Sequence, residues 1–382
     1  MEKNEEDPIP ESNVEVIEDE PEENEDDEIE DTIQELKETP KLYEIPKPSD
    51  NSSKTKKYEP IDWKKAFPNS DTLNNKIPIY WTGNTGPNLV CLHGAGHSGL
   101  SFAPLALLNK QFRIFAFDFR GHGFNTMSNG EDLSVETLIE DTISVLDYIS
   151  SSYPEENIVM IGHSMGGSIA TKACAHILSQ KDKYKDLYEK IQGLICIDVV
   201  EGTAMEALPF MENIVYNRPP SFSSVEKGIE YMFKSGTIKN LESAKISVPP
   251  LLKEVKKGDS TFYEWKTNLM ASKQFWTEWF IGLTKAFLSC KIPKILMLAG
   301  IERMDKDLTI SQMQGKFQLS VVPDVGHIIQ EDDPVKTMKI IEDFIKIFKI
   351  GPKISDMKPI IGKLGNANIL METVKYEEYK QS

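Results

Sequence analysis

NIVMIGHSMGGSIATKACAHIL, residues 157–178, is the stretch that decides the fold. Its apolar start, up to Ile161, predicts a buried strand, Gly162–Gly166 matches the pattern G-x-S-x-G, and Gly167–Leu178 suits a helix. Glycines on both sides of Ser164 allow a tight turn that presents the hydroxyl at the carboxyl end of the strand. The first N–H groups of the helix then face any negative charge that develops there. Strand, sharp turn and helix together nominate Ser164 as a nucleophile, and a glycine-rich turn in an α/β domain is the alternative.

Further apolar runs flank this stretch and predict more strands. They are Ile77–Trp81, Leu89–Leu92, Arg113–Phe119, Leu194–Val199, Lys294–Ala299 and Gln318–Val322. Apolar residues at helical spacing predict a helix over Val135–Ser150, which Ser134 can cap. Alternating strands and helices indicate a mostly parallel sheet with helices on both faces, whose strand carboxyl ends meet at one edge. The α/β-hydrolase fold has this architecture.

Residues 201–291 contain no core strand and predict a cap over the active edge of the sheet. The cap is inserted between the strands that end near Val199 and Ala299. Pro249–Ser260 is rich in lysine and breaks the periodicity, so we expect a mobile loop there. Helical segments are expected at Met211–Tyr216, Val225–Lys234 and Phe275–Phe287.

The formal charge of −17 is confined to the N-terminal end of the 382-residue chain. Residues 1–40 carry 19 Asp and Glu against only Lys3 and Lys37, so the remainder is electrically balanced and gives no support to nucleic-acid binding. This end also has too few large apolar residues to collapse. We expect an acidic disordered tail and linker over 1–57, a catalytic domain over 58–350 and a C-terminal extension over 351–382.

The chain start has neither the basic nor the apolar region of a secretory signal, and no segment approaches the ~20 apolar residues that span a bilayer. We expect a protein of the cytoplasm, the nucleus or both, which is not secreted and not in a membrane. The cysteines lie in or beside apolar segments without metal-binding spacing, and we expect reduced core thiols at Cys91, Cys174, Cys196 and Cys290.

A serine hydroxyl needs a base, because it is a poor nucleophile at its free pKa. His327 is the candidate, since it follows the last predicted strand through a loop that Gly326 allows to turn tightly, where the hydrolase fold carries its base. Four other histidines are expected to support the scaffold: His93, His122, His163 and His176.

Two positions compete for the carboxylate that orients the histidine. Asp305, or less favourably Glu302 or Asp307, follows the strand Lys294–Ala299, which is the commoner place in this fold. Asp198 ends the preceding apolar strand, where a carboxylate is costly to bury unless it is paired. Spacing alone does not separate the two.

The oxyanion of an acyl-transfer intermediate needs two preorganised donors. The backbone N–H of Met165 supplies one, and the loop His93–Gly96 should supply the other, with Ala95 the first choice and Gly94 the second. Residues expected to contact the substrate are Gly94, His97 and Glu201.

Four segments go beyond the fold: CLHGAGHS (91–98), IGHSMGG (161–167), IDVVEGTAM (197–205) and DKDLTISQMQGKFQ (305–318). Together they resemble the protein phosphatase methylesterase family, and the last two are specific to it. The similarity runs from about Tyr58 to Lys349 and includes KNLESA (239–244) in the cap. Family members often carry a long acidic insertion in the cap, whereas Pro249–Ser260 is short and basic.

The resemblance implies removal of the methyl ester from the C-terminal leucine of the protein phosphatase 2A catalytic subunit. By motif, Ser164 matches the nucleophile, Asp198 the acid and His327 the base, which favours Asp198 over Asp305. The methylated tail of that subunit is the expected partner, with no nucleic acid and no membrane. Ser-His-Asp chemistry needs no metal or cofactor.

Two other functions stay open at this point. One is a protein that binds and inhibits the phosphatase, with hydrolysis secondary. The other is a carboxylesterase for generic small esters, which would have no affinity for the phosphatase.

Overall fold

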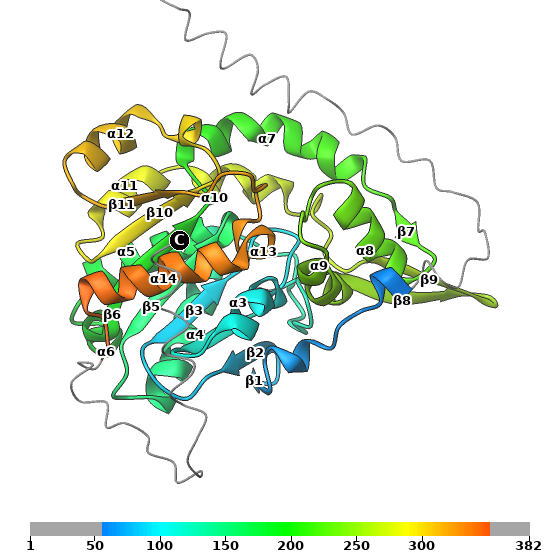
Figure 1. Cartoon of the computed structure of the whole chain (residues 1–382), viewed down its shortest axis with the longest axis horizontal. Coiled ribbons are helices and arrows are strands. Elements are labelled where there is room, and N and C mark those ends of the chain that lie inside the picture. Colours follow the sequence, from blue (N-terminus) through cyan, green and yellow to red (C-terminus); the bar gives the residue numbers. More distant parts are fainter. Residues whose placement is uncertain (1–55, 352–382) are drawn as a thin grey trace, which may run out of the picture. The chain divides into compact units, whose positions relative to one another are not determined.

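A central sheet of eight strands runs through residues 56–351, which are those that the computed structural model describes (Figure 1). The strand order is β1 (Asn69–Leu73), β2 (Ile77–Thr82), β4 (Arg113–Phe117), β3 (Asn88–Leu92), β5 (Ile158–His163), β6 (Ile191–Ile197), β10 (Lys294–Leu298) and β11 (Gln318–Val321). All neighbours from β4 to β11 pair in parallel, whereas β2 pairs antiparallel with both β1 and β4. The predicted mostly parallel sheet is confirmed. The expected tail over 1–57 and the expected extension over 351–382 lie outside the described residues, apart from positions 56, 57 and 351.

Strand β1 escaped the sequence prediction because four of its five residues are exposed and polar. It pairs with β2 through a turn at Asn74 and Asn75, both with positive φ, of 54° and 55°. Two such residues are the signature of a tight hairpin turn. That dipeptide, rather than any apolar pattern, is the signal for this edge strand.

Both faces of the sheet are buried, because alternate residues of each strand point to opposite sides. Ile158 and Met160 of β5 lie in one apolar cluster, whereas Val159 and Ile161 lie in the other. Helices contribute to both clusters, as predicted. Outside the cap they are α3 (Ala103–Leu108), α4 (Val135–Ser152), α5 (Met165–Ser179), α6 (Lys185–Lys190), α12 (Lys306–Met313), α13 (Ile329–Asp332) and α14 (Pro334–Phe348), with 3₁₀ turns at Lys56–Tyr58, Trp63–Lys65, Gly99–Phe102 and Ile301–Arg303.

The N-terminus of α4 is capped differently from the sequence prediction. Ser134 occupies the cap position, but its hydroxyl donates to Asp132 or bonds Thr137 instead of accepting from the helix. The first helical N–H, that of Val135, donates to the carboxylate of Glu278 at 3.0 Å. A residue 143 positions away therefore provides the partner, which no local pattern could reveal.

The cap lies between β6 and β10, as expected, and has its own small sheet. Its helices are α7 (Glu201–Tyr216), α8 (Val225–Lys234), α9 (Leu241–Ser247), α10 (Trp276–Phe280) and α11 (Leu283–Ser289), with 3₁₀ turns at Pro249–Leu251 and Lys273–Phe275. Its sheet has the order β7 (Ser221–Phe222), β9 (Ser260–Trp265), β8 (Leu252–Lys257).

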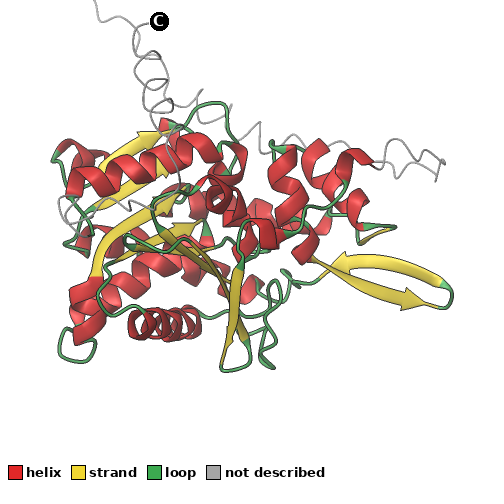
Figure 2. Ribbon diagram, turned by 60° about the horizontal axis from the view of Figure 1, so that its bottom comes forward, coloured by secondary structure: helices red, strands yellow, loops and turns green. Residues whose placement is uncertain are grey.

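The expectation of a loop over Pro249–Ser260 is wrong. Strands β8 and β9 form a regular antiparallel hairpin from Leu252 opposite Trp265 to Lys257 opposite Ser260. It is the long hairpin at the right of Figure 2, which extends from the cap. Because most of β8 is exposed, its lysines show no apolar alternation, and the strand is held by its backbone ladder rather than by burial.

The cysteines and the length of the helices can also be compared with the sequence. Cys91, Cys174, Cys196 and Cys290 are all buried with free thiols, as predicted. Within residues 56–351, none of the helices combines the length and apolar character that a membrane span requires.

Candidate active site

Ser164 lies at a sharp turn between β5 and α5, with φ of 51° and ψ of −123°. A non-glycine residue with this backbone conformation carries roughly 1–3 kcal/mol of strain. Glycines make the turn possible: a β carbon on Gly162 would lie 2.3 Å from the carbonyl oxygen of Gly166, and one on Gly166 would lie 2.3 Å from that of Leu92. The predicted strand, turn and helix around Ser164 are therefore all present.

Asp198 and His327 are brought together at the same edge of the sheet. Nδ1 of His327 lies 2.7 Å from Oδ2 of Asp198, across 129 residues of sequence. The Asp198 side chain is fully buried, whereas the imidazole of His327 is half exposed. Since Nδ1 donates to the carboxylate, Nε2 of His327 is left to accept a proton. Among the described residues no hydrogen bond joins this ring to the Ser164 hydroxyl, and such bonds often tighten only when substrate is bound.

Two further donors hold the Asp198 carboxylate. The N–H of Ala299 donates to Oδ1 at 2.9 Å, and a guanidinium nitrogen of Arg303 donates to Oδ2 at 2.6 Å. Burial raises the pKa of Asp198, but the bond to His327, the charges of His327 and Arg303 and the bond from Ala299 bring it below its usual value. The buried acid is therefore ionised.

Arg303 is a site residue that the sequence reasoning missed. It lies in the loop after β10, the same loop from which Asp305 was nominated. A buried carboxylate at the end of β6 needs a cation or several donors from the neighbouring strand end. That requirement is the signal that could have pointed to this loop as the source of the partner.

Asp305 has other partners. Its Oδ1 accepts from the N–H of Leu308 at 2.8 Å and caps α12, and its Oδ2 accepts from the hydroxyl of Thr284 at 3.0 Å. Both oxygens are thus used to join α12 to α11. The contacts pair His327 with Asp198 and not with Asp305.

The loop His93–Gly96 lies directly against Ser164. The position of a β carbon on Gly94 is 3.3 Å from Cβ of Ser164. In the described part of the chain, neither the N–H of Ala95 nor that of Met165 has a hydrogen-bond partner, so both can donate to an incoming group. This is the arrangement that an oxyanion site needs.

Two buried histidines fix this loop. Nδ1 of His93 donates to the Gly94 carbonyl oxygen at 2.8 Å, and Nε2 accepts from the N–H of Phe119 at 3.0 Å. His122 accepts from the N–H of Gly96 at 3.0 Å through Nε2. Burial lowers the pKa of His122 to about 4, so this ring is neutral and can accept.

The other expected residues are placed as follows. Nε2 of His163 donates to the carbonyl oxygen of His327 at 2.8 Å and ties the base loop to the residue before Ser164, which agrees with a scaffold role. His176 bonds the Tyr184 hydroxyl and is structural. His97 is buried, with Nδ1 3.9 Å from a carboxylate oxygen of Glu331.

Glu201 is engaged within the cap. Its carboxylate accepts from the N–H groups of Gly282 at 2.7 Å and Thr284 at 2.9 Å, which joins α7 to α11. Each oxygen accepts one of these bonds, and the contact of Glu201 with a substrate stays a prediction.

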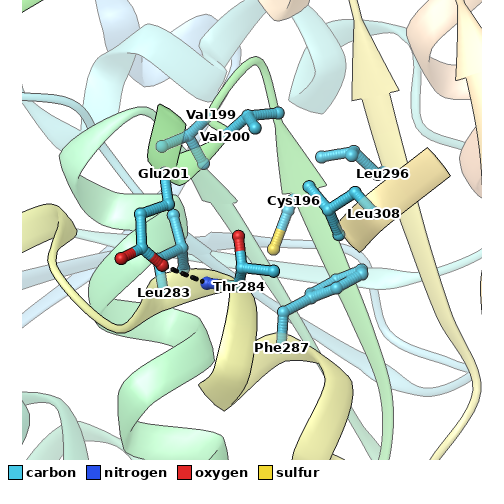
Figure 3. Close-up of a pocket in the computed structure, with 9 residues that line it drawn as sticks. All are labelled: Cys196, Val199, Val200, Glu201, Leu283, Thr284, Phe287, Leu296 and Leu308. Atoms are coloured by element: carbon cyan, nitrogen blue, oxygen red, sulfur yellow. Dashed lines mark hydrogen bonds between the residues drawn. The ribbon is translucent and has the colours of Figure 1, made fainter. Parts of the chain in front are cut away.

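An apolar pocket lies close by, but it is separate from the three residues Ser164, Asp198 and His327, none of which lines it (Figure 3). Its lining comes from the end of β6, the start of α7 and helices α11 and α12: Cys196, Val199, Val200, Glu201, Leu283, Thr284, Phe287, Leu296 and Leu308. Across residues 56–351, no three His, Cys, Asp or Glu side chains are grouped so as to hold a metal ion.

Comparisons with known proteins give the family of the chain. Residues 89–339 match the model of the alpha/beta hydrolase family. The chain is 38% identical over 337 residues to protein phosphatase methylesterase 1 of Mus musculus, covering 75% of this chain and 85% of the relative. It is 41% identical over 297 residues to the probable protein phosphatase methylesterase 1 of Caenorhabditis elegans, covering 76% and 78%.

Solved structures support the fold alone. E-2-(acetamidomethylene)succinate hydrolase matches with a TM-score of 0.59 at 21% identity, over 73% of this chain and 98% of that one. An esterase of Mycobacterium tuberculosis matches with a TM-score of 0.55 at 18% identity, over 73% and 92%. With a family model across most of the sheet and relatives of this identity across most of their length, the chain belongs to the protein phosphatase methylesterase family of α/β hydrolases.

Proposed function

We propose that this chain is a serine esterase that removes the methyl ester from the C-terminal leucine of the protein phosphatase 2A catalytic subunit. The names of its relatives identify a protein phosphatase methylesterase. The observation that carries the proposal is the 2.7 Å contact between His327 and the buried Asp198, at the sheet edge where the half-buried Ser164 lies on its turn.

Ser164 would act as the nucleophile and His327 as the base. Nε2 of His327 takes the hydroxyl proton while Oγ attacks the ester carbon, and the resulting oxyanion accepts from the N–H groups of Met165 and Ala95. The imidazolium then returns the proton to the methoxy oxygen, and methanol leaves. Water, deprotonated by the same histidine, cleaves the acyl-enzyme, which releases the leucine carboxylate and the free serine.

Asp198 would stay ionised throughout this cycle. Its bond to Nδ1 holds the tautomer of His327 that leaves Nε2 free to accept, and its charge stabilises the imidazolium. The lowered pKa of Asp198 supports this role, because a protonated acid could not stabilise a cation. Arg303 would position the same carboxylate through its bond to Oδ2.

The cap would supply an apolar site for the leucyl side chain. Helix α7 starts three residues after Asp198, is mostly apolar and has no fully buried residue. Its partly buried side chains pack against the core, among them Met205 and Leu208. An apolar site over this edge favours a neutral ester over the anionic product.

The test is incubation with the methylated phosphatase catalytic subunit, with the mass of its C-terminal peptide as readout. The wild-type chain should remove one methyl group, whereas Ser164→Ala should leave the ester intact. A fluorophosphonate probe should label Ser164 in the wild-type chain alone. An unlabelled Ser164 would refute the enzymatic mechanism, and a labelled chain that leaves the methylated subunit unchanged would refute the substrate.

A further inference from the structure

One cation of the cap lies beside the loop His93–Gly96. Arg218 lies between α7 and β7 (Figure 1), and its N–H donates to the Val215 carbonyl oxygen at 3.3 Å. Its guanidinium lies over the ring of Trp265, 5.3 Å from the ring centroid. Nε1 of Trp265 in turn donates to the carbonyl oxygen of Pro219 at 2.9 Å. The end of β9 therefore fixes both the backbone and the side chain of this arginine.

The guanidinium reaches the loop that faces the nucleophile. A nitrogen of Arg218 lies 3.5 Å from the position that a β carbon on Gly96 would take. Gly96 follows Ala95, the expected oxyanion donor. The pKa of His97, which adjoins Gly96, lies well below its usual value because of burial first and then of the charges of His163 and Arg218. The charge of Arg218 therefore acts on this loop. A group bound against Gly96 would thus lie close to a positive charge.

Among the four arginines of this sequence, Arg218 is the one whose guanidinium has no hydrogen bond or ion pair within residues 56–351, although Tyr231 lies near enough to interact with its charge. Arg113 donates to Asn88 and Asn84, Arg120 to both oxygens of Asp141, and Arg303 to Asp198. For Arg218, no carboxylate of residues 56–351 lies within ion-pair distance and none of their acceptors takes a hydrogen bond from the guanidinium.

Leaving such a cation unpaired is unfavourable. Arg218 is partly buried, and burial lowers the pKa of its guanidinium while the nearby Tyr231 raises it. The contact with Trp265 offsets part of the cost of burial, since a cation over an indole ring is worth about 0.5–2 kcal/mol. A partly buried guanidinium whose donors lack a protein acceptor is suited to an anion, and to the planar carboxylate above all.

We propose that Arg218 binds a carboxylate of the esterified polypeptide and makes the enzyme selective for it. The inference rests on the proposed function, because it concerns the same substrate. Two carboxylates are available in such a substrate. One is an acidic side chain upstream of the esterified leucine, and the other is the terminal carboxylate that hydrolysis creates.

The first arm of the test measures selectivity for an acidic side chain. Leucine methyl ester peptides are compared in pairs that differ only by Asp or Asn at one of the three positions before the leucine. The wild-type chain should show a kcat/KM at least about tenfold higher for the Asp peptide at one position, and Arg218→Gln should abolish this ratio.

The second arm measures binding of the terminal carboxylate. The same peptide is used as an inhibitor with a free C-terminal acid or a C-terminal amide. If Arg218 takes the terminal group, the wild-type chain should bind the acid at least about tenfold more tightly than the amide, and Arg218→Gln should bind the two equally. Arg218→Lys should retain part of the preference, since a lysine keeps the charge without the fork of donors.

Lys273→Gln is the matched control, because Lys273 is an exposed cap cation that already pairs with Glu212. It removes one positive charge from the cap. It should keep both the kcat/KM ratio of Asp to Asn peptides and the affinity ratio of acid to amide. Loss of either ratio in Arg218→Gln alone supports the proposal and identifies the source of the carboxylate. Ratios that are the same in Arg218→Gln and the wild-type chain, or that fall equally in Lys273→Gln, would overturn it.

The neutral ester p-nitrophenyl acetate separates this inference from the proposed function. If the wild-type chain hydrolyses this ester but no peptide methyl ester, the proposed substrate is wrong. If it hydrolyses peptide esters without the predicted ratios, only the role of Arg218 is wrong.

Discussion

At the scale of single residues, the site depends on two non-glycine residues with positive φ. Ser164 has φ of 51° and Asp198 has φ of 50°. The backbone around them holds these conformations: the N–H of Ser164 donates to Ile197 at 3.0 Å, and that of Asp198 donates to Met297 at 2.8 Å. Strain at each position is thus balanced by bonds between adjacent strand ends, which places the serine and the acid side by side.

The first prediction concerns the choice between two carboxylates. Asp198→Asn should lower kcat for ester hydrolysis on the order of 10³- to 10⁴-fold, because an amide neither holds the right tautomer of His327 nor stabilises the imidazolium. Asp305→Asn should keep the activity within about twofold, since Asn caps a helix as well as Asp does. Full activity in Asp198→Asn would contradict the assignment, as would its loss in Asp305→Asn.

At the scale of elements, the cap is joined to itself and to the core by carboxylates at helix ends. Glu201 at the start of α7 accepts from the N-terminal end of α11, and Glu278 of α10 accepts from that of α4. The first N–H groups of a helix lack partners within it, so each such bond satisfies a donor and orients the helix.

Glu201→Ala should therefore destabilise the fold. The N–H groups of Gly282 and Thr284 would lose a charged acceptor, and we expect the free energy of unfolding in urea to fall by about 1–3 kcal/mol. Glu206→Ala, at an exposed position of the same helix, is the control and should change it by less than about 0.5 kcal/mol. Equal stability of the two variants would show that this link does not hold α7.

Helix α13 contains a buried acid whose protonation should affect stability. Glu331 is fully buried, and burial raises its pKa to about 8, with Asp332 adding to the rise and Ser247 opposing it. The folded state keeps the proton up to about pH 8, whereas the unfolded chain releases it near 4.5. The contribution of the Glu331 carboxyl to the free energy of unfolding is therefore full below pH 4.5 and is lost as the pH rises toward 8.

Glu331→Gln should remove this dependence. Relative to the wild-type chain, the variant should gain stability between pH 5 and pH 8, because its amide has no proton to lose. Urea unfolding at several pH values in this range would measure the difference in free energy of unfolding between the variant and the wild-type chain. A difference that stays constant with pH would mean that Glu331 has no raised pKa in the folded state.

At the scale of the whole molecule, local stability should follow burial. Strands β3 and β5 are buried at every position, whereas β8 is largely exposed and β9 is exposed or partly buried. In hydrogen exchange, the amides of the two central strands should exchange only with global unfolding. Those of the hairpin should exchange on the order of 10² times faster, through local opening. Equal protection of hairpin and central strands would refute this.

Local sequence was sufficient for the elements whose pattern reflects burial. The apolar runs at β3, β5 and β10 predicted buried strands, and Gly162–Gly166 predicted the turn that exposes Ser164. The same reasoning failed for β1 and β8, because exposed strands need only a backbone ladder. It also left the acid open, since Asp198 lies at the end of one predicted strand and Asp305 follows the next.

By itself, the sequence determined the α/β-hydrolase architecture, the place of Ser164 and the family to which the chain belongs. These depend on short-range patterns, which neighbouring residues express directly. Only the tertiary structure decided that His327 contacts Asp198, that Arg303 shares this carboxylate and that Arg218 lies beside the loop His93–Gly96 without an ion pair to any of residues 56–351. Such contacts join residues far apart along the chain, and their energy depends on distance and burial, which the order of residues does not display.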